Sequence, residues 1–170
     1  MKCIAYIPLL LFACILSAQN NENKIEILNA NTIEFDRFIG NGAQRLLGDV
    51  QFKHENMLMY CDSAYYYSES DSLHAFGNIH MIQGDTLHLY GKFLRYDGNT
   101  KIAQVRKNVK MIDRETTLTT EYLDYDLEKK IGFYFNGGRI VNKENHLTSE
   151  KGYYHTAVKT FHFRKDVFCT

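Results

Sequence analysis

The sequence has little of what marks several common protein classes. Its 20 basic residues (Lys and Arg) are balanced by 20 acidic ones, so it lacks the basic excess of a nucleic-acid-binding protein. Four cysteines in 170 residues are too few for a small domain held together by disulfide bonds. Pro8 is the only proline. The chain is nevertheless 45% hydrophobic and 14% aromatic, which excludes a disordered protein and is sufficient for one folded domain.

The one long apolar run lies at the start of the chain and predicts a secretion signal. It extends from Ile4 to Leu16 after the positive Lys2, and it is too short to cross the ~30 Å hydrocarbon layer of a membrane comfortably as a helix. Ala18 ends a pair of small residues, and the chain turns polar directly after it. We therefore expect a signal peptide over residues 1–18, a polar linker over 19–24 and one domain over 25–170.

Two alternatives remain open for this N-terminal segment. Leu11-Phe12-Ala13-Cys14 is the place where a lipoprotein signal would carry its lipid, on Cys14. The other alternative is a membrane anchor that is retained. Removal of residues 1–18 leaves Cys61 and Cys169, which either form a disulfide in an oxidising compartment or stay as two free thiols.

The rest of the chain repeats itself with a period of about 29 residues. Four sets of large apolar residues recur at this step: Tyr67, Tyr96, Tyr125 and Tyr154; Tyr60, Leu89, Leu118 and Leu147; Leu73, Ile102 and Ile131; and Phe76, Val105, Tyr134 and Phe163. Four sets that share one period are hard to explain by chance. We expect the tyrosines to form an aromatic ladder along a stack of similar units.

Within each copy the pattern is that of β-strands. Pairs such as Val50 and Phe52, or Ile79 and Met81, alternate with polar residues, as in a strand with one buried face. Turn signals such as Gly84-Asp85 separate the strands, and no segment after residue 19 has a helical period. The sequence therefore predicts an all-β fold, a jellyroll-like solenoid of stacked antiparallel β-coils in which each repeat buries its apolar face against its neighbours.

One repeat is specific enough to indicate a family. The segment Gly77-Asn78-Ile79-His80-Met81-Ile82-Gln83-Gly84-Asp85-Thr86-Leu87 resembles the Gly-Asn-Val-x-x-x-x-Gly-Asp-x-Leu core of the OstA/LptA-like lipopolysaccharide-transport family. As in that family, a strand ending in Tyr-Asp follows, at Tyr96-Asp97 and again at Tyr125-Asp126. The resemblance covers roughly residues 25–168 and is weakest after residue 138. A new repeat opens at Lys165-Asp166-Val167, so we expect either an end strand that is free to pair with another jellyroll or the front part of a longer protein.

The resemblance implies a V-shaped β-jellyroll in the periplasm that carries lipopolysaccharide and is not an enzyme. The lipid A acyl chains would lie in an apolar trough, since hydrocarbon burial contributes ~0.8 kcal/mol per CH₂ group. For each residue of the trough, ordinary core packing is the alternative interpretation. The candidate lining residues are Val50, Phe52, Leu58, Ile79, Met81, Leu87, Leu89, Phe93, Val109, Met111, Leu118 and Ile131.

The resemblance also implies partners. End strands with unpaired backbone groups would pair with other jellyroll-domain transport proteins or with a second copy of this chain, and the route would lead to an outer-membrane translocon. The chain would serve either as a free periplasmic bridge or as the soluble domain of such a translocon. A mild basic cluster, formed by Arg106, Lys107, Lys110 and Arg114, either meets lipid phosphates or only faces solvent.

Two other classes remain as alternatives. A carbohydrate-active β-solenoid enzyme would need acidic residues gathered on one face, and Asp124 with Asp126 is the nearest approach to such a pair. A purely structural surface repeat would lack a groove for lipid. The seven histidines have no metal-ligand spacing, and no nucleophile or nucleotide motif is present. We therefore expect no catalytic residues, no metal and no cofactor.

Overall fold

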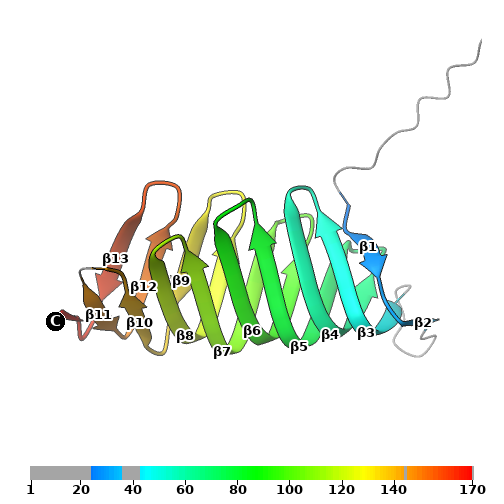
Figure 1. Cartoon of the computed structure of the whole chain (residues 1–170), viewed down its shortest axis with the longest axis horizontal. Coiled ribbons are helices and arrows are strands. Elements are labelled where there is room, and N and C mark those ends of the chain that lie inside the picture. The colour runs from blue at the N-terminus through cyan, green and yellow to red at the C-terminus, as the bar shows by residue number, and fades with distance from the viewer. Residues whose placement is uncertain (1–23, 36–42, 144, 170) are drawn as a thin grey trace, which may run out of the picture.

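The structure is a computed structural model and describes residues 24–35, 43–143 and 145–169. The predicted signal peptide, its alternatives at Cys14 and all but the last residue of the predicted linker lie outside the described residues. Within the described ranges all regular structure is β-strand (Figure 1). Accordingly, no helix in them is long and apolar enough to cross a membrane.

The strands form one 14-stranded antiparallel sheet that does not close on itself. Neighbours in the chain are mostly neighbours in the sheet, as stacked hairpins require. The strands are β1 (Glu26–Asn29), β2 (Thr32–Phe35), β3 (Ala43–His54), β4 (Met57–Tyr67), β5 (Ser72–Gln83), β6 (Leu87–Asp97), β7 (Ile102–Asp113), β8 (Thr116–Asp126), β9 (Ile131–Tyr134), β10 (Gly138–Val141), β11 (His146–Ser149), β12 (Lys151–His155), β13 (Thr160–Arg164) and β14 (Phe168–Cys169).

The long strands β3 to β8 bend near their middles. Successive strand pairs shift register there, between Leu47 and Val50 in β3 and at matching points up to Arg106 and Val109 in β7. Bulges of this kind bend a strand. Gly77 shows why glycine suits the bend, because its φ is 71° and a Cβ there would collide with the Asp62 carboxylate. Gly48-Asp49 and Gly77-Asn78 therefore lie in the middle of β3 and β5.

The bends fold the sheet into two layers that face each other (Figure 1). We call them arm A and arm B. Arm A contains β1, the second halves of β3, β5 and β7, the first halves of β4, β6 and β8, and then β10, β11 and β14. Arm B contains β2, the other halves of β3 to β8, and then β9, β12 and β13.

One continuous core fills the space between the arms. Because side chains alternate along a strand, each arm has an inner face toward this core and an outer face. Arm A contributes Phe52 together with several methionines, leucines and valines. Arm B contributes Leu94, Leu123 and a row of tyrosines. All of these residues are buried. The prediction of an all-β, antiparallel, stacked jellyroll-like fold is confirmed.

The predicted tyrosine ladder exists, but its first member is Tyr66 and not Tyr67. Tyr66 lies opposite Leu73, and Leu73 lies opposite Tyr96, so these residues share the inner face. Tyr67 lies on the outer face, where its ring centroid is 5.3 Å from that of His74.

The cause of this error is one extra residue in a turn. The turn Gly84-Asp85-Thr86 is one residue longer than the corresponding turns Glu55-Asn56 and Arg114-Glu115. The first repeat therefore advances by 30 residues and the later ones by 29, as the inner-face positions Leu73, Ala103 and Gly132 show. A one-residue slip moves a side chain to the other face of a sheet.

Candidate binding site between the two arms

Nine of the twelve predicted lining residues lie on the inner face of arm A, and all nine are buried. The alternation of the sequence was sufficient to identify them, because this arm is apolar on its inner side and mostly polar outside. Whether they contact lipid stays a prediction. They are Val50, Phe52, Ile79, Met81, Leu87, Leu89, Val109, Met111 and Leu118.

The other three predicted lining residues, Leu58, Phe93 and Ile131, lie on the outer face and are only half-buried. Leu58 alternates with inward-facing Met57 and Met59. Phe93 packs on the outer-face ring of Phe76, with centroids 5.4 Å apart, and its neighbour Leu94 faces inward. Ile131 lies opposite Asp126 and His155. Their placement in the trough is thus corrected, because the alternation puts each beside an inner-face residue.

On the inner face of arm B the sequence analysis identified three ladder tyrosines, Tyr96, Tyr125 and Tyr154, but no lining residue. This face carries a row of directly opposed residues in which large and small side chains mostly alternate, because each tyrosine ring needs space over the next strand. The row is Tyr66, Leu73, Tyr96, Ala103, Tyr125, Gly132, Tyr154 and Phe161.

Three of these tyrosines form hydrogen bonds across the space between the arms. The Tyr96 hydroxyl lies 2.6 Å from His54 Nδ1. The Tyr125 hydroxyl donates to Gln83 Oε1 at 3.1 Å, and the Tyr154 hydroxyl donates to Asp113 Oδ2 at 2.7 Å. We call these three contacts the tyrosine rungs.

The tyrosine rungs lie at the free ends of the two arms. His54, Gln83 and Asp113 are the last residues of β3, β5 and β7, just before the hairpin turns of arm A. We call the opening between these turns and the facing turns of arm B the mouth. Strands β3 to β8 run through the bends and so join the two arms there. The arms can separate on the opposite side, at the mouth, which the tyrosine rungs bridge.

Burial keeps the rung hydroxyls protonated. Desolvation raises the pKa of Tyr125 to about 12, and it raises the pKa of Tyr96 and Tyr154 well above the ordinary value for tyrosine. All three side chains are therefore neutral hydrogen-bonding groups at any pH near neutrality. A hydrogen bond between neutral groups contributes ~1 kcal/mol, and the bond from Tyr154 to the Asp113 carboxylate contributes ~1.5–3 kcal/mol, so the rungs are interactions that can be broken.

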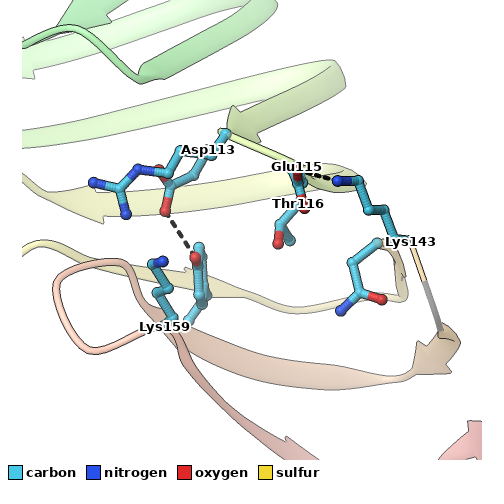
Figure 2. Close-up of a pocket in the computed structure, with 8 residues that line it drawn as sticks. Asp113, Glu115, Thr116, Lys143 and Lys159 are labelled. Carbon is cyan, nitrogen blue, oxygen red and sulfur yellow. Dashed lines mark hydrogen bonds and ion pairs between the residues drawn. The ribbon is translucent and has the colours of Figure 1, made fainter.

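Two cavities open at the mouth beside the rungs. One has a volume of about 480 Å³ and lies between the Arg114 turn of arm A and Lys159 of arm B, as Figure 2 shows for Lys159 and Asp113. The other has a volume of about 320 Å³ and adjoins Gly84 and Lys130. Polar and charged side chains make up most of both walls, in contrast to the apolar interior beneath them.

Comparison with known proteins places this architecture in a family. The sequence profile described as "OstA-like protein" matches residues 22–170. The chain belongs to the OstA-like family. This agrees with the resemblance of its repeats to the OstA/LptA-like pattern, and the family match covers almost the whole described part of this OstA-like chain.

Other comparisons add little. No curated protein matches the sequence. Among solved structures, the chain is similar to LptH from Pseudomonas aeruginosa, described as the LptA homologous periplasmic component of the conserved lipopolysaccharide transport device, with 12% identity, a TM-score of 0.39 and coverage of 88% of this chain and 95% of that one. A TM-score this low does not establish a shared fold, so the fold of this OstA-like chain rests on the strand registers described above.

The acidic pair considered for an enzyme is occupied by structural contacts. Asp124 accepts a hydrogen bond from Arg106 Nη2 at 2.6 Å on the outer face of arm B. Asp126 accepts from the Lys129 backbone N–H at 2.8 Å and from its ammonium group at 2.7 Å, and these bonds lower the pKa of Asp126 against the opposing effect of its burial. Among the described residues, no group of His, Cys, Asp and Glu could hold a metal ion.

The two remaining thiols are far from equivalent. Cys61 is buried and Cys169 is exposed in β14, and neither forms a disulfide. Burial raises the pKa of the Cys61 thiol to about 12, which makes it unreactive at neutral pH. Of the predicted basic cluster, Arg106 lies on the outer face with Asp124 and only Arg114 lies at the mouth.

Both ends of the described sheet carry edge strands with one free side. β1 and β2 pair only with β3, β13 pairs only with β12, and β14 pairs only with β11. Apolar side chains are exposed there, notably Phe35, which is 75% exposed on β2, and Phe168, which is 67% exposed on β14. Exposed edges of this kind are templates for pairing with another chain.

Proposed function

We propose that this chain is a periplasmic lipopolysaccharide transport protein that holds acyl chains between its two arms and has no catalytic activity. The observation that carries the proposal is the apolar interior between the arms, which is bridged on its free side by the tyrosine rungs and by the Lys101–Glu55 ion pair. Membership of the OstA-like family and the predicted secretion signal support the same assignment. The alternatives are a solenoid enzyme and a structural repeat.

Lipid entry requires the two arms to separate at the mouth. In the described state the interior is filled by side chains, so an acyl chain takes the place of contacts between the inner faces. Burying about ten CH₂ groups contributes ~8 kcal/mol, which exceeds the ~4 kcal/mol of the three rung hydrogen bonds. Phosphates and sugars would stay outside, because the interior offers almost no polar groups to pair with them.

Photo-crosslinking tests whether lipid lies between the arms. A benzophenone side chain at Phe52, on the inner face, should crosslink to bound lipopolysaccharide, whereas the same group at Tyr60, on the outer face of the same arm, should give at most a tenth of that yield. Both positions are aromatic in the natural chain, so each substitution adds a benzoyl group to a ring that is already present. The yields are measured on gels with radiolabelled lipopolysaccharide.

Displacement of a fluorescent fatty acid separates this proposal from its alternatives. Saturable displacement by lipopolysaccharide supports a carrier. Equal crosslinking at Phe52 and Tyr60, or no displacement at all, would contradict the proposal and favour a structural repeat. Release of sugar fragments would indicate an enzyme.

The edge strands would pass lipid to the next protein by pairing head to tail, with β13 of one molecule beside β2 of the next. The partner is a second copy of this chain or another jellyroll-domain transport protein, on a route to an outer-membrane translocon. The charges favour this direction, because β2 carries Glu34 and β13 carries Arg164. Such a contact is heterologous and can extend into a filament.

Sedimentation velocity tests the self-pairing. The wild-type protein should form larger species as its concentration rises, and Arg164→Glu should weaken this association several-fold by placing like charges together. Arg95→Glu is the control, since Arg95 lies on β6 in the middle of arm B. A protein that stays monomeric at every accessible concentration would rule self-pairing out.

A further inference from the structure

The turns of arm B place a lysine at the mouth in each of three successive repeats. Lys101, Lys130 and Lys159 occupy the last turn position before β7, β9 and β13, and their φ angles of 56°, 58° and 54° show the same left-handed backbone. Each lies five residues after the tyrosine of one rung. The repeat therefore builds a row of positive charges along one lip of the mouth.

The facing lip of arm A does not repeat its charge. Its corresponding turn residues are Glu55, Gly84 and Arg114, each directly after the residue that accepts or shares a rung hydrogen bond. The second and third of these turns also carry an acid, Asp85 and Glu115, and Asp85 lines the 320 Å³ cavity together with Lys130. Of the three residues that directly follow the rung partners, Arg114 is the basic one.

Only the first lysine of the row is neutralised. Lys101 Nζ lies 2.8 Å from Glu55 Oε1, and this contact raises the pKa of Lys101 and lowers that of Glu55. Among the described residues, no acidic group lies within ion-pair distance of Lys130, Lys159 or Arg114. The same structural position therefore carries a paired cation in one repeat and unpaired cations in the next two.

At the third position two cations border one cavity. Arg114 and Lys159 both line the 480 Å³ cavity, and Arg114 also lines the 320 Å³ cavity together with Lys130. The carboxylates of the larger cavity are engaged elsewhere, because Asp113 accepts the Tyr154 hydroxyl at 2.7 Å and Glu115 pairs with Lys143, as the dashed lines of Figure 2 show. Like charges around one space repel each other unless an anion lies between them.

We propose that this cavity binds a phosphomonoester between the Arg114 guanidinium and the Lys159 ammonium group, with Lys130 supplying a further charge from the adjoining cavity. A guanidinium group can donate two parallel hydrogen bonds to a phosphate, and an ammonium group adds a point charge. The inference rests on the proposed function: a phosphorylated lipid headgroup would sit at the mouth, directly above the interior that holds its acyl chains. Phosphate on a soluble sugar offers the same chemistry.

The test compares two lipids that differ only in phosphate. Affinities of bisphosphorylated lipid A and of the same lipid after dephosphorylation are measured by fluorescent fatty-acid displacement, for the wild-type protein and for the Arg114→Gln, Lys159→Gln double variant. We expect the double variant to bind the phosphorylated lipid at least tenfold more weakly and the dephosphorylated lipid as well as the wild type does. Lys101→Gln is the matched control, since Lys101 has the same turn position and an acidic partner, and it should leave the ratio of the two affinities unchanged.

Glucosamine 1-phosphate, which has no acyl chains, distinguishes the two sources of phosphate. If millimolar glucosamine 1-phosphate protects the wild type against thermal unfolding but does not protect the double variant, the site takes soluble phosphosugars as well as headgroups. If it protects neither protein, the site is restricted to lipid. If both lipids bind equally well to the wild type and the double variant, the phosphate site is wrong and the carrier function stands. If neither lipid binds the wild type, the carrier function fails. The phosphate site is then judged by the phosphosugar alone: protection of the wild type supports the site, and no protection contradicts it.

Discussion

Replacing Gly152 with alanine is expected to destabilise the protein by about 3 kcal/mol, at the upper end of the usual effect of overpacking. Gly152 lies in β12, opposite Tyr134 on one side and Phe163 on the other. A Cβ at this position would be 2.6 Å from the backbone oxygen of His162 and 2.7 Å from the Tyr134 hydroxyl oxygen. A backbone oxygen held in a β-ladder cannot move aside as the end of a flexible side chain can, so β12 and β13 would have to separate.

Gly132→Ala is the matched control for this change. Gly132 occupies the same kind of position, opposite Tyr125 and Tyr154. A Cβ there would meet only side-chain atoms, with Leu123 Cδ1 and Tyr125 Cδ2 both at 3.4 Å, and these distances are ordinary contacts. We expect Gly132→Ala to change the free energy of unfolding by less than about 1 kcal/mol.

Urea unfolding followed by circular dichroism measures both free energies of unfolding. For a chain of this size a loss of 3 kcal/mol corresponds to a fall in Tm of roughly 6–12 °C. Equal stability of the Gly152→Ala and Gly132→Ala proteins would show that β12 and β13 are not packed as described. It would also remove the basis for placing β13 at the edge of arm B.

The fold could be predicted from the sequence because its signals are local. Alternation of side chains marked the strands, and the Gly-Asn and Gly-Asp pairs marked a recurring backbone feature. A positive φ at Gly77 and Asn78 suits a turn as well as a bend in the middle of a strand. Local sequence cannot separate these two cases, because the difference lies in the pairing with neighbouring strands.

The inner lining could be predicted only for one arm. Arm A is apolar inside and largely polar outside, so alternation identified its inner residues. Arm B is aromatic on both faces, as Phe93 outside and Leu94 inside illustrate, and there hydrophobicity does not indicate the direction of a side chain. The extra residue in the turn Gly84-Asp85-Thr86 shifts the spacing of the repeat by one for residues before the turn. A residue there that was matched to an inner-face residue of a later repeat, as Tyr67 was matched to Tyr96, therefore lies on the outer face.

The tyrosine rungs could not be predicted at all. Their partners lie 41 or 42 residues apart, which is not a multiple of the repeat, because each rung joins the end of one repeat to a strand in the other arm. Three different side chains (His54, Gln83 and Asp113) serve as partners, so no motif marks them. What they share is their position at the ends of strands, which only the folded arms bring opposite the tyrosines.

Removing all three rung hydroxyls should lower the stability of the protein and raise its affinity for lipid. In a protein with Tyr96→Phe, Tyr125→Phe and Tyr154→Phe, the closed state leaves His54, Gln83 and Asp113 without their tyrosine partners. Since two of the bonds join neutral groups and contribute ~1 kcal/mol each, and the bond to the Asp113 carboxylate contributes ~1.5–3 kcal/mol, the free energy of unfolding should fall by about 4 kcal/mol, and by more where a buried group is left unsatisfied. When the arms separate, water can satisfy the same groups, so the closed state alone is destabilised.

Lipid binding should respond in the opposite direction. If the rungs must break before acyl chains enter, their absence removes ~4 kcal/mol from the cost of opening, and the affinity for lipopolysaccharide should rise by up to roughly 1000-fold. A control with Tyr65→Phe, Tyr67→Phe and Tyr122→Phe changes three tyrosines of the outer face of arm B and should leave both stability and affinity near the wild-type values. Urea unfolding and fatty-acid displacement measure the two quantities on the same proteins. A rung variant that loses stability and lipid affinity together would show that the tyrosines support the site and do not close it.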